Sequence, residues 1–123
     1  MPINGFDSIC EDHAPRIISQ DRGNSQKHIA HNDLRSYVTH YAIDGVVIRQ
    51  GNRCDYLLLN EDKNTAYLIE LKGSDLAHAA RQLEATENAL RSELSQYNKH
   101  YRIVANKCKT QETLRLMPKR FFF

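Results

Sequence analysis

The chain has 123 residues, of which 41% are hydrophobic and 26% are charged, values typical of one globular domain. No run approaches the roughly 18 consecutive apolar residues of a membrane-spanning helix, and the N-terminus lacks the basic start and apolar core of a signal peptide. We therefore expect a single cytoplasmic domain over residues 1–123, whose net charge of +2 supports a polyanionic partner only weakly.

Cysteine and histidine spacings point away from a thiolate or imidazole metal site. The three cysteines, Cys10, Cys54 and Cys108, are far apart and form no CxxC pair. The six histidines include no recognised ligand spacing such as HExxH. Neither a disulfide framework nor a zinc site is therefore expected.

The first 35 residues carry the weakest pattern in the chain. Pro2, Gly5, Pro15 and Gly23 interrupt short apolar groups, which favours irregular structure. One or two helical turns are expected there or within Ser25–Arg35, where Ser25 can cap a short helix. This segment is the poorly defined part of the predicted domain.

From Tyr37 onward the sequence indicates strands. Residues 37–43 and 46–50 are short β-favouring runs on either side of Asp44-Gly45, and residues 53–60 and 65–72 follow as a hairpin around the polar stretch 61–64. Apolar residues on both faces of the last two strands predict a sheet that is covered on both sides.

A long helix and a further strand complete the predicted core. Between Asp75 and Tyr97 there is no Gly or Pro, and apolar residues recur at helical spacing. Residues 101–105 then read as a strand, and residues 111–116 as a short helix that stops before Pro118. The order predicts a mixed α/β fold, an antiparallel β-meander followed by a long helix and a further strand, with its core over residues 37–106.

The hairpin at residues 53–72 gathers charged side chains at one end. If residues 61–64 form the loop, Asn60 faces Thr65 and Asp55 faces Glu70. Directly opposed residues of an antiparallel pair share a face, with Cβ atoms about 4.5–5.5 Å apart. Lys72 returns to that face because side chains alternate with a period of two.

Two opposed carboxylates repel each other unless a cation neutralises them, and their hard oxygen atoms suit Mg²⁺ or Mn²⁺. A bound metal can activate a water molecule and a phosphoryl group, while Lys72 adds a fixed positive charge. The alternative is a plain surface ion cluster, which would contribute little to stability. The apolar neighbours of Glu70 favour the functional interpretation, because a charge in such a strand needs a reason.

The pattern of Asp55, fourteen intervening residues and then Glu70-Leu71-Lys72 resembles the D…(D/E)xK signature of the PD-(D/E)xK nuclease superfamily. That superfamily includes restriction enzymes, Holliday-junction resolvases and RecB-like exonucleases. Its members share a helix, a three-stranded antiparallel meander, a second helix and a further strand, an order that residues 37–106 match from the meander onward. Cys54 stands where the nominal proline would be.

The resemblance implies a restriction endonuclease-like core and a Mg²⁺- or Mn²⁺-dependent nuclease. Asp55, Glu70, Lys72 and Gln82 would be its catalytic residues, with Asp55 and Glu70 as metal ligands. Glu11 would be an additional metal ligand from the first helix, as many members have one there. Asp44 competes with Asp55 for the first ligand position, although Asp44-Gly45 is more typical of a turn.

The substrate is expected to be nucleic acid, with DNA favoured over RNA. The last quarter of the chain is basic, and the phosphate contacts are assigned to Lys99, Arg102, Lys107 and Lys109. The tail Phe121–Phe123 can pack either at the interface of a homodimer or on its own core. The alternative to an enzyme is a non-catalytic nucleic-acid- or protein-binding module on the same scaffold.

Overall fold

The computed structural model describes residues 3, 5–20, 26–48, 53–71 and 76–104. These residues form a mixed α/β structure with one helix and two sheets. In chain order its elements are β1 (Arg16–Gln20), β2 (Lys27–His31), β3 (Val38–Ala42), β4 (Tyr56–Asn60), β5 (Thr65–Leu71), α1 (Leu76–Ala89) and β6 (Asn98–Val104).

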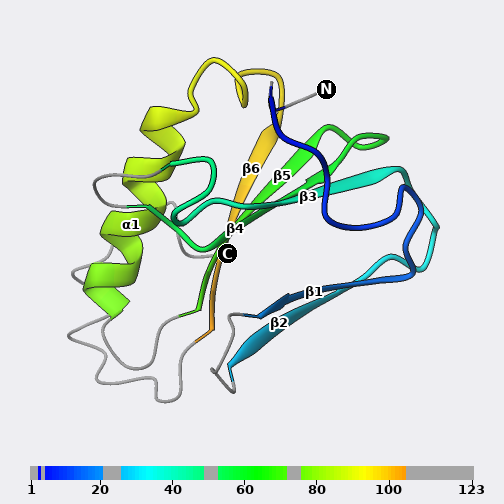
Figure 1. Ribbon diagram of the computed structural model, residues 1–123, viewed down its shortest axis with the longest axis horizontal. Helices are drawn as coiled ribbons and strands as arrows, with labels where there is room; N and C mark the ends of the chain where they lie inside the picture. Colours follow the sequence, from blue (N-terminus) through cyan, green and yellow to red (C-terminus); the bar gives the residue numbers. More distant parts are fainter. Residues whose placement is uncertain (1–2, 4, 21–25, 49–52, 72–75, 105–123) are drawn as a thin grey trace.

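The larger sheet has the strand order β3-β4-β5-β6 (Figure 1). Strands β3, β4 and β5 are antiparallel neighbours, and β4 pairs with β5 in the predicted register, with Asn60 opposite Thr65. Strand β6 runs parallel to β5. The connection through α1 returns the chain to the end of the sheet where β5 begins, so that Asn98 lies opposite Thr65. The predicted meander, helix and further strand are therefore present.

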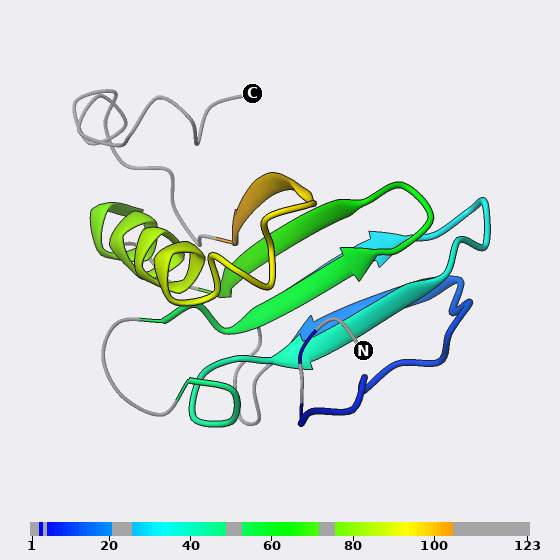
Figure 2. The same ribbon diagram turned by 90° about the horizontal axis from the view of Figure 1, so that it is seen from above.

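The sheet is covered on both faces, as the apolar pattern of β4 and β5 predicts. Helix α1 packs on one face, where Leu57 and Leu68 meet Leu83 in the larger core cluster. The two-stranded sheet β1-β2 covers the other face, where Ile17 meets Leu58 and Ile69. Figures 1 and 2 show α1 and the β1-β2 hairpin on opposite sides of β3–β6.

The prediction of irregular structure near the N-terminus is confirmed for residues 5–15, but the prediction for the rest of the stretch before residue 36 missed two strands. Residues 16–20 and 27–31 form an antiparallel hairpin, and β1 alternates strictly between exposed and buried positions. Its two buried side chains, Ile17 and Ser19, face the larger sheet, so the hairpin owes its place to tertiary packing. Among the described residues no helix precedes the meander.

The predicted strand at residues 46–50 is also not formed in its described part, residues 46–48. This stretch is a turn with an isolated bridge between Asp44 and Ile48. The amide of Ile48 donates a hydrogen bond to the carbonyl of Ile43 at 3.0 Å, and Gly45 has a φ of 79°. The Asp44-Gly45 turn signal thus dominates over the β-branched side chains that follow it.

Helix α1 ends at Ala89, well before the predicted end at Tyr97. Turns follow it, and they still bury Leu90 and Leu94 against the same core. The apolar stripe therefore continued past the end of the helix, which is why spacing alone overestimated its length. Strand β6 starts three residues earlier than predicted. The predicted helix at 111–116 and the tail at 121–123 lie outside the described residues.

None of the described helical structure has the length and apolar character required to cross a bilayer.

Candidate active site

Asp55 and Glu70 lie near each other at one end of the hairpin formed by β4 and β5. The ladder between the two strands ends at Tyr56 opposite Ile69, and Asp55 lies in the bend just before β4. The amide of Asp55 donates to the carbonyl of Ile69 at 3.1 Å, and Asp55 Oδ2 accepts a hydrogen bond from the amide of Leu71 at 2.7 Å. The predicted register is therefore confirmed from Asn60–Thr65 to Tyr56–Ile69, and at Asp55 the regular pairing gives way to a bond between its side chain and the Leu71 amide.

Both carboxylates are buried under the layer that contains α1. The exposed fraction is 8% for Asp55 and 1% for Glu70. By the alternation of strand side chains Glu70 shares a face with Leu68, which packs in the α1 cluster. Because buried charges in proteins are paired or bind metal ions, this location separates the pair from an ordinary surface ion cluster.

Gln82 on α1 connects the pair to the preceding loop. Its Nε2 donates a hydrogen bond to Glu70 Oε2 at 3.0 Å, and its Oε1 accepts one from the amide of Arg53 at 3.1 Å. A side-chain amide is suited to this position because it donates and accepts at once. Gln82 therefore orients the Glu70 carboxylate and holds the chain that leads into Asp55.

We expect Gln82→Ala to destabilise the protein by about 1–3 kcal/mol, because it removes a donor from buried Glu70 and the acceptor of the Arg53 amide. Urea denaturation of the variant beside Gln96→Ala, a truncation at an exposed position, measures the effect. Equal stability of the two variants would show that the Gln82 bridge contributes nothing to the fold.

Thr86, one turn after Gln82, is a supporting residue that the sequence interpretation missed. Its Oγ1 accepts a hydrogen bond from the amide of Cys54 at 2.6 Å and donates one to the carbonyl of Gln82 at 2.9 Å. Thr86 is fully buried. The i, i+4 spacing of two polar residues on the otherwise apolar face of α1 is the signal that could have revealed it.

The thiol of Cys54 is buried close to the negative charges of Glu70 and Asp55. Burial raises the pKa of its thiol to about 12; the hydrogen bond with Thr86 opposes this, and the negative charges of Glu70 and Asp55 add to it. The thiol therefore stays protonated near neutral pH and is not available as a nucleophile. The same negative potential favours a cation beside the two carboxylates.

Asp44, the competing candidate for the first ligand position, is engaged elsewhere. Its Oδ1 forms an ion pair with Arg53 Nε at 2.6 Å, and Asp44 lies in the exposed turn after β3. Asp44 is therefore the ion-pair partner of the Arg53 side chain, while the backbone amide of Arg53 donates its hydrogen bond to Gln82.

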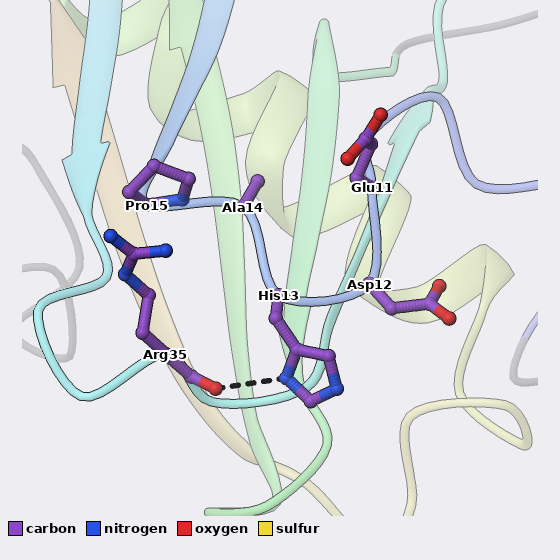
Figure 3. Close-up of a pocket in the computed structure, with 6 residues that line it drawn as sticks. All are labelled: Glu11, Asp12, His13, Ala14, Pro15 and Arg35. Atoms are coloured by element: carbon purple, nitrogen blue, oxygen red, sulfur yellow. Dashed lines mark hydrogen bonds between the residues drawn. The ribbon is translucent and has the colours of Figure 1, made fainter.

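Glu11 is not brought to the carboxylate pair. It is an exposed residue of the loop before β1, where it lines a cavity of about 560 Å³ with Asp12, His13, Ala14, Pro15 and Arg35 (Figure 3). The carbonyl of Asp12 accepts from the amide of Val38, which lies level with Asn60. Five residues of strand, about 16 Å, separate that level from Asp55.

The predicted basic residues are only partly described. Lys72, Lys107 and Lys109 lie outside the described residues. Lys99 and Arg102 are both on β6 but on opposite faces of the sheet, because they are three positions apart. Lys99 lies opposite Ala66, far along β5 from Glu70, and Arg102 packs over Tyr67 on the face away from α1. These two residues do not form one phosphate-binding patch.

Within the described residues, no three His, Cys, Asp or Glu side chains gather into a metal-binding group. The Asp55–Glu70 pair itself fits Mg²⁺, which typically uses one or two protein carboxylates and completes its octahedron with waters and substrate phosphates. Asp55 and Glu70 are therefore the described residues at this end of the hairpin whose oxygen atoms are chemically suited to a hard divalent cation.

Comparison of the chain with protein-family models, with curated proteins and with solved structures finds no match.

Proposed function

We propose that the protein is a metal-dependent nuclease that hydrolyses phosphodiester bonds of nucleic acid, with DNA favoured over RNA. The observation that carries the proposal is the pair of buried carboxylates, Asp55 and Glu70, at one end of the β4–β5 hairpin, where Asp55 bonds to the Leu71 amide and Glu70 to Gln82 of α1. A hydrophobic face is an unfavourable place for two carboxylates, and binding a divalent cation compensates for it.

In this proposal Asp55 and Glu70 hold Mg²⁺ or Mn²⁺. When bound, such an ion supplies Lewis-acid activation of the scissile phosphate and of the attacking water. Gln82 keeps the Glu70 carboxylate in one orientation, and the amide of Leu71 does the same for Asp55. Lys72, two residues after Glu70, supplies the positive charge that orients the water or stabilises the developing negative charge.

The unit from β3 to β6 is proposed to be a restriction endonuclease-like core. Its three-stranded meander, helix and parallel strand support this assignment, and the β1-β2 hairpin occupies the part of the chain where the superfamily pattern has a helix. Since the described residues bring no acidic side chain from such a helix to Asp55, the proposed metal site rests on two protein carboxylates. A second subunit would supply further contacts to a double-stranded substrate.

The test is cleavage of labelled plasmid, linear DNA, branched DNA and RNA in Mg²⁺, Mn²⁺ or EDTA. Lys72→Ala is expected to lower the rate about 10²-fold or more, since one fixed charge at a phosphoryl transition state contributes several kcal/mol. Lys63→Ala, which removes the same charge from the exposed 61–64 turn, should cleave like the wild type.

Metal-dependent cleavage that falls only in Lys72→Ala supports the nuclease. If the wild type cleaves none of the substrates and still binds nucleic acid, the protein is a non-catalytic binding module and not a nuclease. Equal cleavage by Lys72→Ala and Lys63→Ala would place the active site elsewhere.

A further inference from the structure

A second pocket lies on the sheet face that points away from the carboxylate pair. It has a volume of about 230 Å³ and is lined by His28, Ile29, Ala30, Tyr67 and Arg102. Three of these residues come from β2, and the other two come from the adjacent strands β5 and β6. The pocket is therefore a gap between the small sheet and the edge of the large one, and none of these five lining residues is acidic.

Arg102 lies over the ring of Tyr67 in this pocket. Its guanidinium carbon lies 5.2 Å from the centroid of the Tyr67 ring, and the Tyr67 ring stacks on His100 with centroids 5.5 Å apart. Its Nη1 also donates to the carbonyl of Tyr101 at 3.1 Å. An arginine that is stacked and anchored in this way loses little entropy when its planar fork binds an oxyanion.

His28 adds a second polar group to the same pocket. Its Nδ1 atom is buried and has no hydrogen-bond partner among the described residues. Burial and the positive charge of Arg102 lower the pKa of His28, so its imidazole is neutral near pH 7 and carries one N–H donor. A buried polar atom without a partner is unfavourable, and in the tautomer that carries its proton on Nδ1 a ligand oxygen would satisfy it.

We propose that this pocket binds the phosphate group of a phosphate monoester, with the Arg102 fork and the His28 imidazole as its donors. A phosphate group offers three acceptor oxygens, enough for the fork and for a separate N–H donor. Arg102 brings a positive charge to the lining, which suits an anionic ligand. The inference does not depend on the proposed nuclease, because the two sites share no residue and lie on opposite faces of the sheet.

The test is a ¹H–¹⁵N NMR titration of the full chain with inorganic phosphate, adenosine monophosphate and adenosine. Both phosphate compounds are expected to shift the amide signals of β2 and of residues 67 and 102, and adenosine is not. Arg102→Gln should weaken phosphate binding about tenfold or more, since hydrogen bonds between charged groups contribute about 1.5–3 kcal/mol. The phosphate affinity of Arg102→Lys should fall between those of the wild type and Arg102→Gln, because lysine keeps the positive charge and lacks the planar fork.

Arg91→Gln is the matched control, since Arg91 is exposed after α1 and its removal changes the net charge equally. Tighter binding of adenosine monophosphate than of inorganic phosphate would identify a nucleotide as the source of the phosphate, and equal binding would identify free phosphate. The proposal fails if phosphate shifts no signal of the pocket, or if Arg102→Gln binds phosphate as tightly as Arg91→Gln.

Discussion

Glu70→Gln is expected to lower metal-dependent cleavage by about 10³-fold or more, because losing the cation at the reacting phosphate removes several kcal/mol of transition-state stabilisation. The substitution is nearly isosteric and leaves an amide that can still bond to Gln82, so the fold should persist. Steady-state cleavage of a labelled DNA in Mg²⁺ measures the loss.

A second measurement separates metal binding from chemistry. Mg²⁺ or Mn²⁺ should raise the unfolding temperature of the wild type, since a ligand that binds only the folded state stabilises it, and should leave Glu70→Gln unchanged. Glu93→Gln is the matched control, because Glu93 is exposed beyond the end of α1. Metal-dependent stabilisation that survives in Glu70→Gln would place the cation at other residues.

The stability of the protein is expected to fall by about 3 kcal/mol between pH 6.5 and pH 4 because of His40 alone. Its side chain is 2% exposed, and burial lowers its pKa from 6.5 to about 4, with a smaller effect from His28. The unfolded chain therefore binds a proton in this range and the folded chain does not. The contribution is fully present above pH 6.5 and is lost as the pH falls toward 4.

Urea denaturation as a function of pH measures this slope. His40→Gln should flatten the profile between pH 6.5 and 4, leaving the smaller contribution of His28, whose pKa burial lowers in the same direction. Ser19→Ala is the informative control, since it removes the 2.9 Å hydrogen bond to His40 Nε2 and keeps the histidine buried. It should lower stability and keep the slope. If the stability of His40→Gln depends on pH as steeply as that of the wild type, the protons taken up on unfolding belong to other groups.

The hairpin register shows how much local sequence can determine. A polar four-residue loop between two apolar runs defines which residues face each other, from Asn60 and Thr65 out to Tyr56 and Ile69. The two-sided apolar character of β4 and β5 likewise predicted layers on both faces. These features depend only on neighbours along the chain and on backbone geometry, and so they follow from the order of the amino acids.

The β1-β2 hairpin and the end of α1 do not follow in this way. The strand Arg16–Gln20 has only two buried positions, and their stabilisation comes from β3–β6, far away in the sequence. Leu90 and Leu94 continue the helical spacing past Ala89 because the turn after the helix packs on the same core. In both places long-range burial, and not local propensity, decided the backbone.

The candidate site also has one part that local sequence determines and another part that depends on tertiary packing. The sequence by itself determined that Asp55 and Glu70 come to the same end of one hairpin, because the register of that hairpin follows from its own pattern. Only the tertiary structure decided what surrounds them. It brought Gln82 and Thr86 from α1 onto the loop at Arg53 and Cys54, and it left Glu11 at the far end of β3. The physical reason is that the docking of a helix or loop on a sheet depends on the packing of whole faces, which no local spacing encodes.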